Sequence, residues 1–201
     1  MFDADDRLGS ANQLLWWPGW HPGYSLVIGL LLGGVVALLA EAPGIVVLGV
    51  VGGIVWWFVG TRVINGGYGE VMREYGRYTE RVAQARMSTA GENTASYTLT
   101  SASGGAPLVE PAKDYYSTTL IVGDSSVSIH DGVGVDMESR TPYLKDNTRE
   151  VYFDQVASVS YDRPILRINT SDGDALRYKS SREPDDAMSD LQGRVRSYKT
   201  A

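Results

Sequence analysis

Two uncharged apolar runs, separated by a short loop, constrain the fold of this chain more than any other feature. The first extends from Leu26 to Ala40 and the second from Ile45 to Gly60, with residues 41–44 between them. With its rims the first run reaches about 19 residues, and a helix of that length is about 29 Å long, close to the hydrocarbon thickness of a bilayer. The sequence therefore predicts a transmembrane helical hairpin over residues 24–64.

Two rival explanations of these runs are less consistent with the sequence. Buried core helices of a soluble protein would need much surrounding core, yet neither run has a polar face and the remaining chain is short. A signal peptide cleaved near Glu41 would need a basic start and an early apolar run, whereas the first residues here are acidic. We therefore favour an integral membrane protein with the bilayer as its first partner.

Charges that flank the runs predict the orientation of the hairpin. The loop carries only Glu41, whereas five arginines follow the second run: Arg62, Arg73, Arg77, Arg81 and Arg86. Because basic residues are retained on the cytoplasmic side, both termini are predicted to be cytoplasmic.

Aromatic residues gather at the same predicted interface. Residues 1–23 form an aromatic N-terminal segment in which Pro18 and Pro22 interrupt any long helix, so we expect this segment to lie in the headgroup region. His21 in this segment is interpreted as an amphipathic ring. The predicted interface residues are Trp16, Trp17, Trp20, Tyr24, Trp56 and Trp57.

Glycines recur at a spacing of four in both runs. Gly29 and Gly33 lie in the first, and Gly49 and Gly53 in the second. Small residues four apart line one helix face and let two backbones approach closely. We expect the hairpin to pack on itself through these faces, with an intermolecular contact as the alternative.

Residues 65–87 carry an apolar seam that favours an amphipathic stalk helix. Asn65, Gly66 and Gly67 offer a hinge before it. Two interpretations stay open: a self-associating coiled coil, or a helix that packs on the soluble part or lies on the membrane. The seam residues are Tyr68, Val71, Tyr75, Tyr78 and Val82.

Residues 88–114 are rich in small polar residues and predict a flexible linker, with one short alternating segment, 96–100, that could add an edge strand. Residues 115–201 are predicted to form a soluble domain, in which the pattern has a period of two from about Ser117, typical of half-buried strands. A helix from Pro184 follows, with Met188, Leu191, Val195 and Tyr198 on one stripe. The seven predicted strands are 118–122, 127–129, 133–137, 150–153, 156–161, 165–170 and 175–179.

This order of elements resembles the pleckstrin-homology-like (PH-like) domains that some prokaryotic proteins attach to membrane helices. The stretches that carry the resemblance are Val151–Tyr161, Leu166–Thr170 and Asp172–Asp174. The resemblance implies an α+β protein in which a seven-stranded antiparallel β-barrel or sandwich is closed by a C-terminal helix. That fold hosts lipid, peptide and protein ligands, so it does not define a function.

In this family, headgroup binding usually relies on basic residues around the loop between the first two strands. Here that loop, residues 123–126, has none. Basic residues fall on the last strands instead, either as a contact for an anionic partner or as solvated partners of nearby carboxylates. The candidate anionic contact comprises Arg163, Arg167, Arg177 and Lys179.

Composition limits the chemistry. The chain has no Cys and two His, His21 and His130, and it shows no nucleophilic triad, metal-ligand spacing or phosphate-binding loop. We therefore predict no enzyme, no catalytic residue, no cofactor and no metal. The net charge of −6 argues against nucleic acid as a partner, and the four lysines among many aspartates are typical of salt-loving archaea.

Together these features predict a membrane-anchored interaction or scaffold protein that presents a PH-like domain to an unknown protein partner at the cytoplasmic face. One alternative is a structural membrane protein of an envelope or viral assembly, formed as a homo-oligomer. Another is a module that senses a small ligand.

Overall fold

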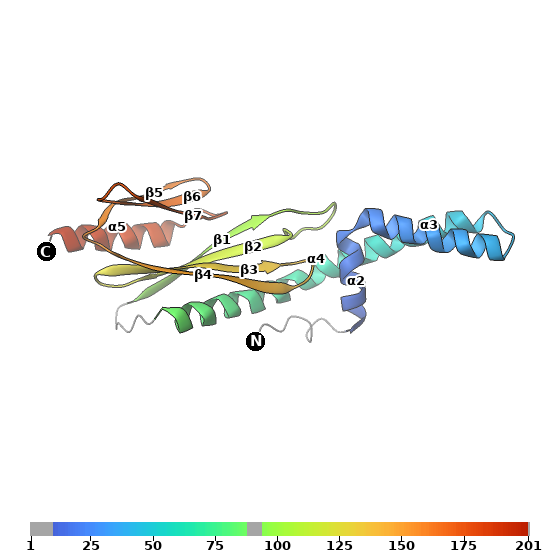
Figure 1. Ribbon diagram of the computed structural model, residues 1–201, viewed down its shortest axis with the longest axis horizontal. Helices are drawn as coiled ribbons and strands as arrows, with labels where there is room; N and C mark the ends of the chain where they lie inside the picture. Colours follow the sequence, from blue (N-terminus) through green and yellow to red (C-terminus); the bar gives the residue numbers. More distant parts are fainter. Residues whose placement is uncertain (1–9, 88–93, 201) are drawn as a thin grey trace. The chain divides into compact units, whose positions relative to one another are not determined.

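The computed structural model describes residues 10–87 and 94–200, which form an α+β fold (Figure 1). The chain divides into two compact units. One comprises residues 1–75, 103–113 and 136–141, and the other comprises residues 76–102, 114–135 and 142–201. The helices of the first unit are α2 (Ser10–Trp20), α3 (Pro22–Leu39) and most of α4 (Ile45–Arg86).

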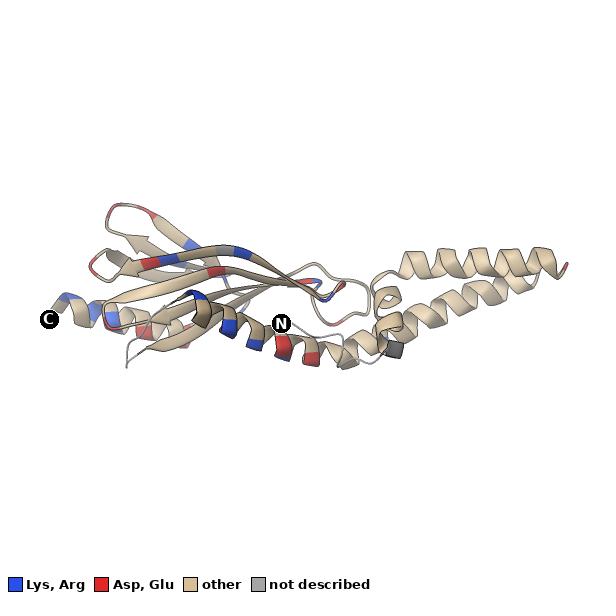
Figure 2. Ribbon diagram, turned by 60° about the horizontal axis from the view of Figure 1, so that its bottom comes forward, with Lys and Arg blue, Asp and Glu red and all other residues tan. Residues whose placement is uncertain are grey.

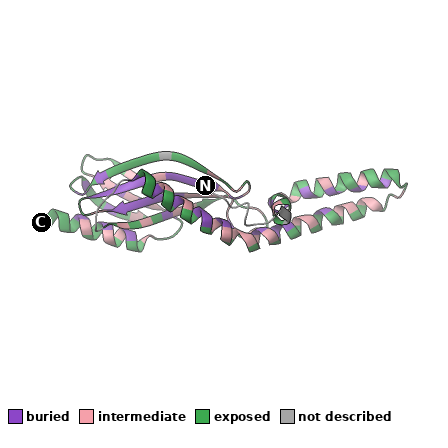
Figure 3. Cartoon of the chain, turned by 90° about the horizontal axis from the view of Figure 1, so that it is seen from below, coloured by how far each residue is buried: buried purple, intermediate pink, exposed green. Residues whose placement is uncertain are grey.

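Both α3 and α4 contain a stretch that is long and apolar enough to cross a membrane. Only 22% of that stretch in α3 and 17% in α4 is buried, and Figure 3 shows both helices mostly in the colours of exposed and intermediate residues there. Side chains such as Leu31 and Leu38 are 62% and 82% exposed. Charged residues are absent from α3 and from the first part of α4 (Figure 2). A core helix of a soluble protein would hide most of this surface.

The prolines of the N-terminal segment act differently from one another. Pro22 begins α3 and separates it from α2, which fits the preference of proline for the first turn of a helix. Pro18 lies inside α2, so helix continues through a part of the segment that we predicted to lie flat in the headgroup region.

Helix α4 runs unbroken through Asn65, Gly66 and Gly67, where we predicted a hinge. The side chain of Asn65 is held at both ends: its Nδ2 donates to the Leu108 carbonyl at 3.0 Å, and its Oδ1 accepts from the Glu110 N–H at 2.9 Å. Each glycine lowers intrinsic helix stability by about 1 kcal/mol, a cost that such tertiary contacts offset.

The second unit contains two antiparallel sheets, and its described residues form seven strands. The four-stranded sheet has the order β1 (Ala95–Ser103), β2 (Asp114–Val122), β3 (Ser126–Asp136) and β4 (Thr141–Tyr152). The three-stranded sheet has the order β5 (Val156–Asp162), β6 (Ile165–Thr170) and β7 (Ala175–Lys179). The C-terminal helix α5 spans Asp185–Thr200.

Three of these strands differ from the sequence prediction. Strand β1 lies inside the segment predicted as a flexible linker; it is the edge strand offered for residues 96–100, longer than expected and anchored by Leu99, which is 2% exposed. The segments 127–129 and 133–137 belong to one strand, β3, with no turn at Asp131 and Gly132. A Cβ on Gly132 would lie 1.7 Å from the Lys145 carbonyl oxygen, so this glycine permits close approach of β4. Strand β4 begins in the predicted polar loop.

The core of this unit lies between the sheets and α5 and includes Phe153, Leu166 and Ile168, each essentially fully buried. Of the predicted helix stripe, Leu191 and Val195 are buried, whereas Tyr198 is 44% exposed. The hairpin between β6 and β7 turns at Gly173, whose φ of +94° favours glycine, as the Asp-Gly pattern predicts. The last turns of α4 contribute Ala83, which clusters with Met87 and with Ile121 of β2.

Candidate functional site

The four glycines predicted to line the hairpin meet where α3 contacts α4. A Cβ added to Gly29 would lie 2.3 Å from the carbonyl oxygen of Gly49, and one added to Gly49 would lie 2.3 Å from that of Gly29. A Cβ on Gly33 would lie 2.9 Å from the Cα of Gly49. Because real Cβ contacts are longer, the close approach of these helices depends on glycine.

Sequence reasoning missed two extensions of this glycine contact. Ser25 lies four residues before Gly29 and faces Gly53, whose added Cβ would lie 2.5 Å from the Ser25 carbonyl oxygen. Gly19 of α2 similarly meets Gly60 of α4: a Cβ added to Gly19 would lie 2.5 Å from the carbonyl carbon of Gly60. The available signal was the spacing of four, which continues along the buried face of α3 as Ser25, Gly29, Gly33 and Ala37.

Two of the six predicted interface aromatics are instead buried within the protein. Trp16 is 1% and Trp20 is 5% exposed, so neither ring is free to sit among lipid headgroups. Trp17 and Tyr24 are exposed, and Trp56 and Trp57 are half-buried. The pattern of aromatic residues did not separate the two kinds of environment, since large rings suit both.

The seam of the stalk helix is largely covered by the chain itself. Val71 and Tyr75 are 0% and 2% exposed, and Tyr68, Tyr78 and Val82 are half-buried. Of the two interpretations of this seam, a packed amphipathic helix fits this burial better than a self-associating coiled coil.

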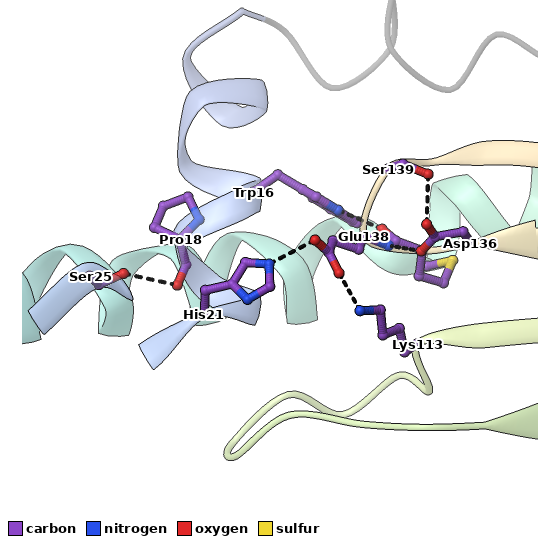
Figure 4. Close-up of polar contacts among 9 residues, drawn as sticks. Trp16, Pro18, His21, Ser25, Lys113, Asp136, Glu138 and Ser139 are labelled. Carbon is purple, nitrogen blue, oxygen red and sulfur yellow. Dashed lines mark hydrogen bonds and ion pairs between the residues drawn. The ribbon is translucent and has the colours of Figure 1, made fainter. Parts of the chain in front are cut away.

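A polar cluster centred on Glu138 joins the N-terminal helices to residues that follow β3 and precede β2 (Figure 4). Its Oε1 lies 2.7 Å from Nε2 of His21, and its Oε2 forms an ion pair with Lys113. The hydrogen bond from Lys113 holds the pKa of Glu138 below its usual value, against an opposing effect of burial, with a further lowering by His21. Sequence reasoning missed Glu138 and Lys113, because the pairing spans long sequence separations.

Trp16 belongs to the same cluster. Its indole Nε1 donates to the carbonyl of Met137 at 2.7 Å (Figure 4). The guanidinium of Arg140 lies 5.5 Å from the centre of the same ring. Asp136 stabilises the adjoining turn by accepting from the Glu138 N–H at 2.9 Å and from the Ser139 hydroxyl at 2.8 Å. The cluster fixes α2 and the residues around Glu138 as one structural element.

The predicted anionic contact is brought together in part. Arg167 of β6 lies directly opposite Arg177 of β7, and Lys179 lies opposite Ile165 two positions along, so these three basic side chains share one sheet face. Arg167 pairs with Asp162 at 3.7 Å. Arg163 stands apart in the turn that joins β5 to β6.

A cleft of about 400 Å³ opens beside Arg177, between β3, β4 and β7. Asp131 of β3 lines it and accepts a hydrogen bond from the Thr118 hydroxyl at 2.6 Å. Burial and the charge of Asp131 raise the pKa of Tyr178 to about 12. Burial, followed by the charge and hydrogen bond of Asp131, raises the pKa of Tyr116 to about 12. The lining residues are Ile129, Asp131, Asn147, Thr148, Arg149, Ala175, Leu176, Arg177 and Tyr178.

A second, more open groove of about 740 Å³ lies between the start of β1 and α5. Three of its polar side chains, those of Tyr97, Asp190 and Arg194, bond to one another. The Tyr97 hydroxyl donates to Asp190 at 3.2 Å, and Arg194 contacts both Asp190 at 3.0 Å and Asp124 at 2.9 Å. These contacts stabilise the junction of helix and sheet.

The two histidines of the chain have different environments. His21 contacts Glu138, whereas His130 is fully buried in β3. Across residues 10–87 and 94–200, the structure contains no group of three or more His, Asp or Glu residues that could hold a metal ion.

No known protein family matches the chain, and no curated protein is similar to it.

Proposed function

We propose that this protein is a membrane-anchored interaction protein, which presents a PH-like domain at the cytoplasmic face of the membrane. The observation that carries the proposal is the exposure of the apolar side chains on α3 and on the first part of α4. In water this surface would be strongly unfavourable, at about 25 cal/mol per Å² of apolar area. In a bilayer the same surface is solvated by lipid.

The second unit supports the PH-like assignment through its element order. A four-stranded sheet is followed by a three-stranded sheet and then by α5, whose residues Ala187, Leu191 and Val195 enter the core. With β1 included, the domain begins near Ala95 rather than at residue 115.

An interaction role fits the surface of this domain. It carries the basic side chains of β6 and β7 and an adjoining cleft. Attachment to the membrane raises the effective concentration of the domain toward partners at the same surface, with no chemical step required.

Membrane topology can be tested with single cysteines, because the natural chain has none. Gly44→Cys lies in the loop between α3 and α4, and Gly105→Cys lies after β1; neither glycine has a neighbouring atom within 4 Å of an added Cβ. We expect an impermeant maleimide to label Gly44→Cys in intact cells and Gly105→Cys only after permeabilisation. The reverse pattern, or release of the full chain by alkaline carbonate, would refute the proposed anchoring.

The interaction role requires a second test, namely affinity capture from native membranes. Full-length protein is compared with a variant that ends at residue 93 and keeps α2, α3 and α4. We expect a partner to be recovered with the full chain only. Discrete homo-oligomers cross-linked equally well by both forms would favour the alternative of a structural assembly.

A further inference from the structure

Two arginines on different strands line the cleft between β3, β4 and β7. Arg149 comes from β4 and Arg177 from β7. Among the side chains that the structure describes, neither arginine forms an ion pair within 4 Å. The charge of Arg149 lowers the pKa of Asp172, but it is the weakest of the several effects on that pKa. A guanidinium without a carboxylate partner is suited to an external oxyanion, which it can bind through two parallel hydrogen bonds.

The position of Arg177 adds a second argument. It lies directly opposite Arg167 in the register of β6 and β7. Like charges at directly opposed positions destabilise a sheet. Arg167 has Asp162 at 3.7 Å, whereas an anion bound in the cleft would offset the charge of Arg177.

The charges around the cleft limit the charge of its ligand. Within the lining, two guanidinium groups and the carboxylate of Asp131 leave one net positive charge. A smaller cavity of about 140 Å³ shares Arg149 and Leu176 with the cleft and is also lined by acidic side chains. These are Glu150, Asp172 and Asp174. They would repel a ligand with several negative charges, so the cleft favours a single one.

The size and lining of the cleft favour an organic group over a bare ion. Its volume of about 400 Å³ is in the range of small-ligand sites. Leu176, which is half-buried, provides apolar surface, and the exposed Asn147 and Thr148 add hydrogen-bonding groups. A glycerol-based headgroup has this combination of a charged centre, hydroxyls and short carbon chain.

We propose that this cleft binds a singly charged phosphodiester with a polyol substituent, and that Arg149 and Arg177 hold its two non-bridging oxygens. The assignment deepens the proposed function, because it names one class of ligand for the domain. The same chemistry occurs in the headgroup of phosphatidylglycerol and in free glycerophosphodiesters. The membrane anchor makes the lipid the more abundant source.

The first arm of the test uses the soluble headgroup. Glycerophosphoglycerol is titrated into the full chain in maltoside micelles and binding is measured by calorimetry. We expect Arg149→Gln and Arg177→Gln each to weaken binding at least tenfold. The control Arg196→Gln removes the same charge from an exposed position of α5, outside the cleft, and should leave the affinity unchanged. Arg177→Lys keeps the charge but loses the two parallel N–H donors of the guanidinium, so its affinity for the diester should lie between those of the natural protein and Arg177→Gln.

The second arm adds phosphatidylglycerol to the micelles and follows hydrogen exchange of residues 147–151 and 175–178. Protection from exchange in this arm alone identifies a lipid ligand, and binding in the first arm identifies a free diester. Either result supports the site if the effect is lost in the Arg149→Gln and Arg177→Gln variants. Absence of binding in both arms, equal affinity of all variants with unchanged unfolding midpoints, or tighter binding of an inositol polyphosphate overturns it. The first arm needs no bilayer, so its failure leaves the anchoring of α3 and α4 intact.

Discussion

Replacement of Gly49 by alanine should separate the helices of the hairpin. The added Cβ would lie 2.3 Å from the Gly29 carbonyl oxygen and 2.6 Å from the Gly33 Cα, both backbone atoms that cannot rotate away. Restoring a contact of about 3.5 Å requires the helices to move apart by about 1 Å, and a gap of that size forfeits a quarter to a half of the dispersion energy. We therefore expect Gly49→Ala to lower the free energy of unfolding by about 1–3 kcal/mol.

Gly52→Ala is the matched control, three residues along the same helix. Its Cβ would meet no atom within 4 Å, so only the change in backbone entropy remains, which stabilises by about 0.4–1 kcal/mol. The two variants should thus shift in opposite directions when SDS is titrated into maltoside micelles and helix content is followed by circular dichroism. If Gly49→Ala is as stable as Gly52→Ala, the close contact between α3 and α4 is refuted.

Three further predictions concern the polar cluster, the cleft and the core. Glu138→Gln should lower the free energy of unfolding by about 1 kcal/mol at neutral pH. Because the pKa of Glu138 lies below its ordinary value, its contribution is present above pH 4.5 and is lost as the pH falls through the lowered pKa, so thermal unfolding of the variant should lack this acid-dependent loss. Asp131→Asn should lower the pKa of Tyr116 from about 12, seen as earlier phenolate absorbance in an alkaline titration; an unchanged titration would contradict the role of that carboxylate. Phe153→Ala should cost about 3–5 kcal/mol in chemical unfolding, whereas its exposed neighbour Tyr152→Ala should cost little, and equal losses would contradict the assigned core.

The apolar runs were readable from sequence because length and lack of charge are properties of the helix itself. Both runs form helices that could cross a membrane. The glycine spacing predicted a small-residue face on each helix, and Gly29 and Gly49 of those faces lie in close contact. The Asp-Gly turn before β7 was readable for the same reason, since its signal is local.

Features that depend on distant residues were not readable. Gly132 looked like a turn, yet it lies within β3 because the β4 backbone passes beside it. Trp16 looked like an interface residue, and its burial depends on Met137, 121 positions away. Arg149 and Arg177 are far apart in the sequence, and they line one cleft only through the arrangement of β4 and β7.

Strand β1 determines where a stable soluble fragment can begin. A fragment that starts after it would lack Leu99 and would leave the hydrogen-bonding groups of β2 unpaired along an open side. Unprotected strand borders of this kind recruit other chains and promote aggregation. Poor solubility of such a truncated form would therefore reflect a missing strand, and a start near Gly76, which keeps β1 and the last turns of α4, should restore well-behaved material.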